Sequence, residues 1–479
     1  MTFRNLLSGN GKKPEFATTA SPLRRIESWM FLLLIGFKCQ VLWRTWGHPQ
    51  GYDAGPWLQV FQATHWFAKL PGPRQLFYSY HPPLAFLIAR LLEFIVLKPV
   101  EASQLLATIG MIGAACAIRG TLRRLDFFYS VIGMTFFYFS FSIPIVVWLG
   151  IETSQDSLSF GWWSLSLYLA VSIFWGPLPS QSKLVIRQGT GLAVVYGLGL
   201  LTKTTNLLAF FTPFFVIALG ALFDLIAARS SNYSVHGQTP LRSILNGGGR
   251  KTVLATIIGM TGFLLALPYL YFHNYRAEGR LFPVSMEWQV SDQLTTYRAM
   301  RDADRVGFVM NMLRLPEHPK HFHVGQNADD PAMDSLPAST WFQTWRRPWQ
   351  IGRPTPVPEE IGRVYYYGFV PLLFLGPIAF FLLYRRLPRP VVQFSLLLMA
   401  TSLLASLFLL KFAYDYPMWP WTVFKTKYVI QAVLWLGMSF ALIVECRNFL
   451  PPRFRGPLAK VAFLFLLIFM SINHLIPVY

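Results

Sequence analysis

The feature that most constrains this chain is a succession of apolar runs, each about long enough to cross a membrane. A helix needs about 20 apolar residues to cross the hydrocarbon core, where only a fully hydrogen-bonded backbone is tolerated. With 53% hydrophobic and 13% charged residues among 479, the chain is too apolar for an ordinary soluble domain. The sequence predicts an all-α polytopic membrane protein with eleven spans. They are 27–46, 103–118, 126–149, 157–176, 188–202, 206–228, 252–273, 364–384, 391–410, 427–445 and 461–477.

One further apolar stretch, residues 83–97, is short and is interrupted by Arg90 and Glu93. If it crossed the membrane, every later span would reverse its direction. If it lies on the membrane surface instead, the basic loops that follow it fall on the same side as the N-terminus. We therefore expect 83–97 to lie on the outer surface.

The basic residues give the orientation. Lys and Arg number 42 against 22 Asp and Glu, a net charge of +20, and half of the 42 fall on the N-terminal side, where Glu15 is the only clear acid. Basic residues in short loops stay cytoplasmic, so the excess charge is an orientation signal and not a sign of nucleic-acid binding. These residues are Arg4, Lys12, Lys13, Arg24, Arg25, Arg119, Arg123, Arg124, Lys183, Arg187, Arg229, Arg242, Arg250, Lys251, Arg385, Arg386, Arg389, Arg447, Arg453, Arg455 and Lys460.

This topology divides the chain into four parts. Residues 1–26 form a cytoplasmic N-terminal segment, and the run that follows is expected to be an uncleaved signal anchor. Residues 27–273 form a membrane module with a first outer loop at 47–102. Residues 274–363 form an outer cap, and 364–479 carry the C-terminal membrane helices. Shorter outer segments are expected at 150–157, 203–205 and 411–426.

The acidic candidates lie in two outer loops. Asp53 follows the first span beside Tyr52, and Glu152 and Asp156 lie in the short second loop. Of such carboxylates one can act as a base, and another can orient a substrate or hold a divalent cation such as Mg or Mn, for which Asp156 is the candidate ligand. The alternative for Glu152 and Asp156 is capping of the next helix. For His81, in the first loop, substrate contact and a structural hydrogen bond are both open.

Basic candidates flank the outer helix ends. Lys203 is the only charge between two apolar runs, and its burial is costly unless it meets an anion. Arg276 and Lys427, with Lys425 beside the latter, flank other outer ends, so together they suit an anionic lipid headgroup. The alternative for Lys203 is a side chain that extends to the membrane surface. A weaker metal signal comes from His318, His321 and His323.

Taken in order, these segments resemble the polytopic GT-C glycosyltransferases, most closely the protein mannosyltransferase and aminoarabinose transferase branch. The resemblance covers about residues 27–440, and it depends on the order and sidedness of motifs that are individually short. The motifs are an acid after the first span, YSYHPPL at 78–84, a loop with E-x-x-x-D entering a helix, GLGLLTKTTNLLAFFTP at 197–213, NYRAEGRLFP at 274–283 and VFKTKYVIQA at 423–432.

The resemblance implies transfer of a sugar from a polyprenyl phosphate to an acceptor hydroxyl or amine at the outer face. By position, Asp53 matches the family's first-loop catalytic acid, Asp156 its second-loop acid, and Lys203 a residue near the lipid phosphate. Two departures leave the metal requirement and the acceptor open. Ala54 stands where many members have a second acid, and His81 stands where some branches have Lys.

The chemistry of the residues fits this activity. Glycosyl transfer passes through an oxocarbenium-like state and needs a base for the nucleophile and positive charge for the departing phosphate. Asp53 is expected to be the base, and Lys203, with Arg276 or Lys427, to stabilise the phosphate. The alternatives are a transporter or flippase for a lipid-linked saccharide and a non-catalytic scaffold. The bacterial plasma membrane is the default location, with the endoplasmic reticulum as the alternative.

Overall fold

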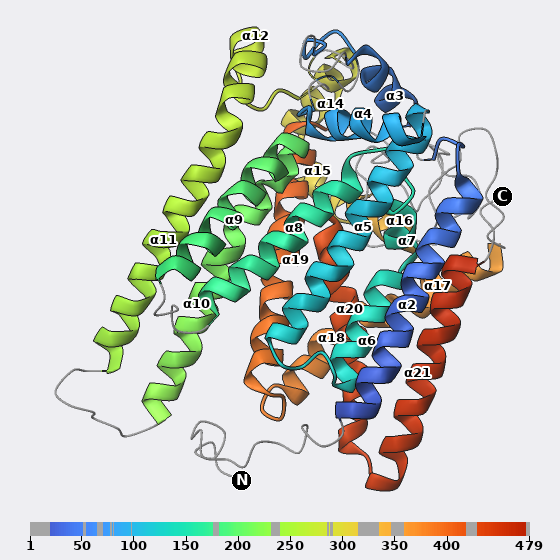
Figure 1. Cartoon of the computed structure of the whole chain (residues 1–479), viewed down its shortest axis with the longest axis vertical. Helices are drawn as coiled ribbons and strands as arrows, with labels where there is room; N and C mark the ends of the chain where they lie inside the picture. Colours follow the sequence, from blue (N-terminus) through green and yellow to red (C-terminus); the bar gives the residue numbers. More distant parts are fainter. Residues whose placement is uncertain are drawn as a thin grey trace.

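The computed structural model describes residues 20–50, 54–64, 70–76, 79, 81–96, 98–175, 182–230, 240–284, 287, 291–314, 335–345, 359–417 and 429–475. All the regular elements in these ranges are helices, and ten helices are long and apolar enough to cross a membrane. The long helices stand side by side, with α2 next to α21 (Figure 1). The chain is therefore an all-helical, multi-pass membrane protein, as the sequence predicted.

The membrane helices and the short helices between them have these bounds: α2 Ala20–Thr45, α3 Ala54–Ala63, α4 Leu84–Val96, α5 Pro99–Arg124, α6 Val131–Ser142, α7 Pro144–Leu149, α8 Asp156–Phe174, α9 Ser182–Thr202, η3 Thr204–Asn206, α10 Leu207–Ser230, α11 Pro240–Tyr269, η4 Leu270–Tyr275 and α12 Arg276–Glu278. The later helices are α14 Ser291–Ala303, α15 Arg305–Met312, α16 Leu336–Trp345, α17 Glu359–Gly368, α18 Val370–Leu383, α19 Arg389–Asp415, α20 Ile430–Glu445, η8 Cys446–Phe449 and α21 Pro452–Leu475.

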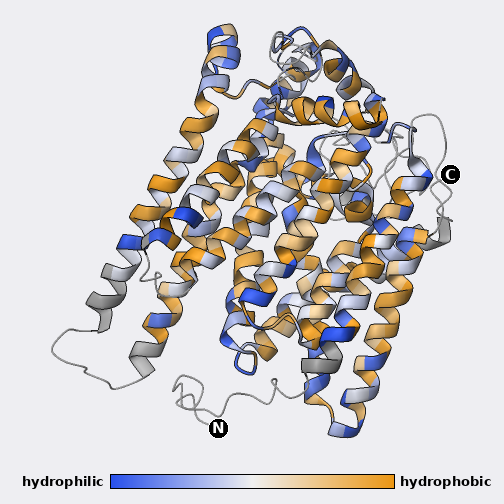
Figure 2. Ribbon diagram, in the orientation of Figure 1, coloured by the Kyte–Doolittle hydropathy of each residue, from blue (hydrophilic) through white to orange (hydrophobic). Residues whose placement is uncertain are grey.

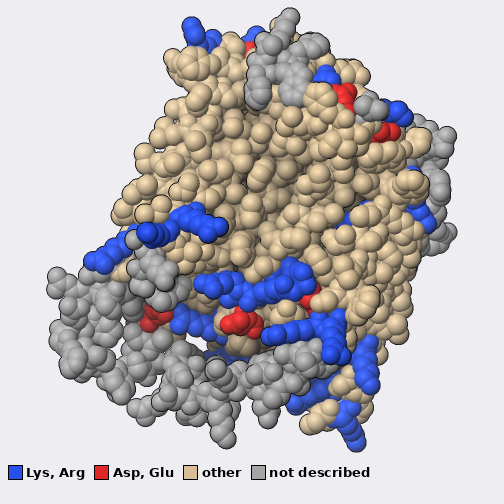
Figure 3. Space-filling model, in the orientation of Figure 1, with Lys and Arg blue, Asp and Glu red and all other residues tan. Residues whose placement is uncertain are grey.

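One end of the bundle is strongly basic. Hydrophobic residues dominate the long helices, and hydrophilic residues collect towards their ends (Figure 2). In the face shown in Figure 3, Lys and Arg gather over the end where α2 and α21 begin. We call this the basic end. The opposite end, where α3, α4 and α12 lie, is called the outer end, following the orientation that the sequence predicts.

The expected span at 126–149 is not one continuous helix. It folds as α6 and α7, because Ile143 adopts an extended conformation (φ −60°, ψ 133°) directly before Pro144. Proline favours this conformation in the residue before it and cannot donate a helical hydrogen bond. Both short helices are buried, and α6 packs against α20 and α21. The prediction of eleven spans is therefore corrected to ten long helices and one broken, packed segment.

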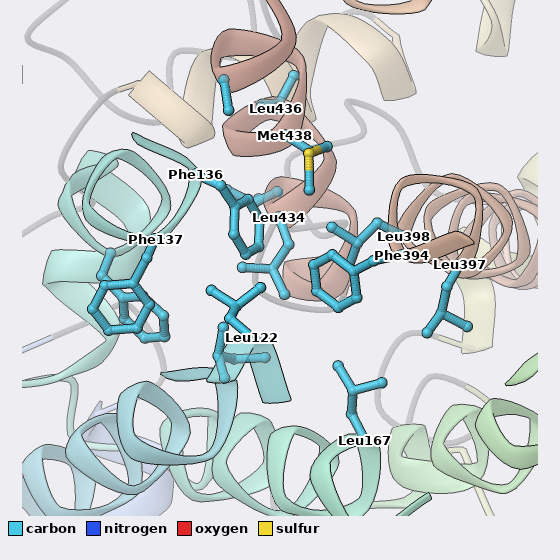
Figure 4. Packing of buried hydrophobic residues seen from close by; sticks show 14 of the residues in the cluster. Leu122, Phe136, Phe137, Leu167, Phe394, Leu397, Leu398, Leu434, Leu436 and Met438 are labelled. Carbon is cyan, nitrogen blue, oxygen red and sulfur yellow. The ribbon is translucent and has the colours of Figure 1, made fainter. Parts of the chain in front are cut away.

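The largest apolar core joins α6 to α19 and α20. The rings of Phe136 and Phe394 meet edge to face with their centroids 5.6 Å apart. Leu434 and Met438 of α20 are also buried in this cluster (Figure 4). Lipid is as apolar as these side chains, so close packing, more than escape from water, holds the helices together.

The helix α4 lies across the outer end of the bundle, as expected for residues 83–97 (Figure 1). The side chain of Arg90 turns back to the end of α3, where it donates to the carbonyls of Phe61 at 2.9 Å and Thr64 at 3.1 Å. It also pairs with Glu93 at 2.5 Å. The last carbonyls of a helix have no partner within it, so Arg90 caps α3 from α4.

Two glycines set the position of α8. A Cβ atom on Gly110 of α5 would lie 2.7 Å from the backbone nitrogen of Leu158, and one on Gly161 would lie 2.8 Å from the Gly110 carbonyl oxygen. A side chain at either position would push the two helices apart, so the approach requires glycine. It brings the start of α8, and with it Asp156, against α5.

The basic end holds acids that the sequence analysis did not place there. Glu15 lies outside the described residues, but Glu27 of α2 is fully buried and pairs with Arg119 at 2.7 Å and Arg123 at 3.2 Å. Glu27 begins the first apolar run, which is why it was counted with the span. Glu15 is therefore not the only acid on this side.

Candidate functional site

A buried ion pair stands at the outer end of the bundle. Asp156 begins α8, and Lys203 lies in an extended backbone between α9 and η3. The Lys203 ammonium donates to the Asp156 carboxylate, and the two residues are 3% and 4% exposed. Ser154 donates from Oγ to the other Asp156 oxygen at 3.1 Å. The contact joins an acidic residue and a basic residue that were both predicted site residues. Because Lys203 is buried, the interpretation of its side chain as one that extends to the membrane surface is wrong.

Asp156 does not occupy the N-cap of α8, although it lies at the start of that helix. Gln155 occupies the N-cap of α8, and its side chain makes no capping hydrogen bond. Asp156 is the first residue of the helix, where a negative charge is favoured by the helix dipole. Its backbone N–H donates to Ser154 Oγ at 3.3 Å. Asp156 therefore lies at a helix N-terminus and also takes part in an ion pair.

The second outer loop, which carries Glu152, is hydrogen-bonded to the start of the first outer loop and to α5. Thr153 accepts from the backbone N–H of Gln50 at 3.2 Å through Oγ1 and donates its own N–H to the Gln50 carbonyl at 2.9 Å. From α5, Thr108 Oγ1 donates to the Gly150 carbonyl at 2.7 Å. Glu152 itself is buried. These bonds join the start of the first outer loop to the second, as the sequence analysis expected of segments on one face.

Some predicted site residues lie outside the described part of the chain. They are Tyr52, Asp53, His318, His321, His323, Lys425 and Lys427. Gln50, which is bonded to Thr153, precedes Asp53 by three residues. Ala54, which follows it, is fully buried at the start of α3.

His81 is buried at the other side of the first outer loop, and its carbonyl accepts from the Tyr269 hydroxyl at 3.2 Å. Nearby, His273 Nε2 contacts the Pro71 carbonyl at 3.0 Å. Arg74 pairs with Glu278 of α12 at 2.7 Å, and this hydrogen bond raises the pKa of Arg74. The loop around His81 is thus held to the end of α11 and to η4 and α12.

Arg276 is not brought into contact with the Asp156–Lys203 pair. It is exposed at the start of α12 and makes no hydrogen bond or ion pair in the described part of the chain. Its neighbour two residues on, Glu278, is the partner of Arg74. The site role of Arg276 stays a prediction.

Sequence reasoning missed the polar side chains that hold the site together. Gln50, Thr108 and Thr153 are buried and hydrogen-bonded between the two outer loops and α5. The available signal was their position, because each is an uncharged polar residue that lies shortly after an apolar run or, for Thr108, in the outer part of one. A charge-based search passes over such residues.

The predicted metal ligand has other partners. The Asp156 carboxylate is hydrogen-bonded to Lys203 and Ser154. Within the described ranges, no three His, Cys, Asp or Glu side chains are grouped so that they could hold a metal ion. These contacts do not favour Asp156 as a ligand, and the divalent cation stays a prediction.

Comparison with known proteins gives distant structural matches only. No protein-family profile matches the chain, and no curated protein does. A crystal structure of ArnT from Cupriavidus metallidurans bound to undecaprenyl phosphate is similar with a TM-score of 0.36 and 13% identity, over 90% of this chain and 80% of that one. The apo state of ArnT gives 0.35 and 12%, over 89% and 80%. The chain itself is a multi-pass helical membrane protein.

Proposed function

We propose that this protein is a membrane glycosyltransferase of the GT-C type. It would move a sugar from a polyprenyl-phosphate-linked donor to a glycan, lipid or protein acceptor at the outer face of the membrane. The observation that carries the proposal is the buried Asp156–Lys203 pair, which stands beside Glu152 where the two outer loops are joined through Gln50 and Thr153. The order of the sequence motifs from the first loop to 423–432 supports the same class of enzyme.

In this proposal Asp53 is the general base that accepts the proton of the incoming nucleophile, which attacks with inversion at the anomeric carbon. The leaving group is the lipid phosphate, and Lys203 stabilises its negative charge, assisted by Arg276 or Lys427. A lysine has three N–H donors. The bond to Asp156 holds the ammonium of Lys203 at this position, where the proposal has it meet the phosphate.

The test is transfer of radiolabelled sugar from a panel of polyprenyl-phosphate sugars by the purified protein. Asp53→Asn keeps the size of the side chain and removes the base, so transfer should fall about 10²- to 10⁴-fold. Asp126→Asn is the matched control, because Asp126 is exposed in the turn after α5 with φ +56°, a conformation that asparagine accepts.

Three outcomes separate the possibilities. Loss in Asp53→Asn alone supports both the enzyme class and the base. Full transfer by a normally expressed Asp53→Asn protein would rule out the base role. Binding of the donor lipid without turnover, in the wild type as well, would favour a flippase or a scaffold. Dialysis against a chelator before the assay tests the predicted cation, since a required metal would show as activity restored by Mg or Mn.

A further inference from the structure

Three buried amide oxygens around the candidate site have no hydrogen-bond partner. They are Oε1 of Gln50, Oε1 of Gln155 and Oδ1 of Asn206, in residues that are 0%, 2% and 2% exposed. In the described part of the chain only two other amide oxygens share this property, those of Gln188 and Gln431. Three of the five are therefore in residues of the two outer loops or next to Lys203, and their burial without a donor calls for a physical reason.

Two of the three residues adjoin the ion pair in the chain, and the third is bonded to the loop that precedes Asp156. Gln155 directly precedes Asp156, and the Gln50 backbone is bonded to Thr153 two residues earlier. On the other side, the backbone N–H of Asn206 donates to the Lys203 carbonyl at 3.0 Å. The three residues thus belong to segments that directly adjoin Asp156 or Lys203 or are bonded to the loop that precedes Asp156.

For two of the amides the orientation is fixed by the nitrogen. Gln50 Nε2 donates to the His48 carbonyl at 3.1 Å, and Asn206 Nδ2 donates to the Gly199 carbonyl at 2.9 Å. Exchanging oxygen and nitrogen would set oxygen against oxygen in both cases. The unpartnered atoms of Gln50 and Asn206 are therefore acceptors, and they require donors.

Leaving a buried acceptor without a donor costs about 1–3 kcal/mol each, so each such group in a folded protein requires an explanation. A sugar offers several O–H donors in one small molecule, and an amide oxygen accepts from a hydroxyl in good geometry. We propose that Gln50, Gln155 and Asn206 form a subsite that binds sugar hydroxyls beside the Asp156–Lys203 pair. This inference rests on the proposed function in that it names the groups that recognise the transferred sugar.

The test compares Gln155→Leu with Gln188→Leu. Gln188 has the same unpartnered amide oxygen but lies near the start of α9, about four helical turns before Lys203. In both variants removal of an unsatisfied acceptor should leave the unfolding temperature unchanged or raise it. The probes are short-chain isoprenyl-phosphate mannose, glucose and arabinose together with their monodeoxy analogues, and both binding and transfer are measured.

We expect Gln155→Leu to weaken binding of at least one sugar about tenfold, with Gln188→Leu like the wild type. For the wild type, the deoxy analogue that lacks the recognised hydroxyl should bind about tenfold more weakly than the parent sugar. For Gln155→Leu, the deoxy analogue and the parent sugar should bind equally well. If Gln155 had a purely structural role, the loss caused by its substitution would not depend on whether the sugar carries that hydroxyl.

Two results would overturn the inference. One is equal binding of every sugar to the wild type and to Gln155→Leu, which would mean that ordered water supplies the donors. The other is a wild type that binds no member of the panel. If this dependence on the hydroxyl is found but no sugar is transferred, the subsite stands and the transferase assignment fails.

Discussion

The two ends of the bundle each bury charged residues. They differ in whether the buried polar groups on and near these residues have hydrogen-bond partners. At the basic end Glu27 accepts from Arg119 through both oxygens, at 2.7 and 2.8 Å, and from Arg123 at 3.2 Å. The Tyr138 hydroxyl donates to the Glu27 carbonyl at 2.9 Å, and the Arg119 guanidinium stacks over Phe31 at 4.1 Å. This cluster has partners on every side and joins α2, α5 and α6.

At the outer end the buried Asp156–Lys203 pair adjoins segments that carry buried acceptors without a donor. Asp156 and Lys203 are bonded to each other, while the amide oxygens of Gln50, Gln155 and Asn206 are buried without a partner. A satisfied network stabilises a fold, whereas an incompletely satisfied one reduces stability. On the proposed function, we therefore expect the Glu27 cluster to serve structure and the segments around Asp156 and Lys203 to serve binding and chemistry.

The largest effect is expected from breaking the outer pair. Lys203→Met leaves the Asp156 carboxylate buried without its cation, so the free energy of unfolding should fall by about 3–5 kcal/mol. In the double variant Asp156→Asn with Lys203→Met, most of that loss should be regained, because neither charge remains. Sugar transfer should stay about 10²- to 10³-fold below the wild type, because the phosphate has lost its cation. Unfolding and transfer are measured on the same detergent-solubilised samples.

The double variant decides whether the ends differ. If it recovers transfer together with stability, the outer pair acts only as a structural contact, like the Glu27 cluster, and Lys203 has no part in catalysis. Lys203→Arg separates position from charge, since it keeps the cation while its larger, planar head cannot take the same place.

A smaller effect, on stability alone, is expected at the basic end. Glu27→Gln removes the charge that Arg119 and Arg123 share in a buried position, so the free energy of unfolding should fall by about 3 kcal/mol. Transfer per folded molecule should remain at the wild-type level. The control is Asp224→Asn, which breaks the half-exposed pair with Arg389 and should cost at most about 1 kcal/mol. Loss of transfer in folded Glu27→Gln protein would contradict the division of roles.

The sequence predicted the membrane helices because their signal is long and nearly continuous. It placed 83–97 across the outer end correctly, although it could not show that Arg90 caps α3, since that contact joins two helices. It missed the break at Pro144 because an apolar run of that length hides the effect of one proline on Ile143. A proline inside a span was not a sufficient signal, because Pro213 lies within the continuous helix α10.

The candidate site was predictable where it depends on charge and not where it depends on neutral polar groups. Asp156 and Lys203 stood out as ionisable residues beside apolar runs, but nothing in the sequence indicated that they are in contact, because they are 47 positions apart. Gln50, Gln155 and Asn206 carry no charge, and they became candidate binding residues only because their amide oxygens are buried without a hydrogen-bond partner. Such a property belongs to the packed structure and cannot be read from the spacing of residues.

The smallest effect is expected at Lys38, another buried charged residue, which lies between the two ends on α2. It is 4% exposed, and its one hydrogen bond is to the Val146 carbonyl of α7 at 3.3 Å. Lys38→Met fills nearly the same volume, loses that bond and removes the cost of burying an ammonium, so the free energy of unfolding should change by no more than about 1 kcal/mol in either direction. Cys39→Ala, at the exposed position beside it, is the control for changes on this helix. A loss above 3 kcal/mol, or a collapse of transfer, would place Lys38 with Lys203 as part of the outer cluster, because only a cation with an essential anionic or polar partner is so costly to replace.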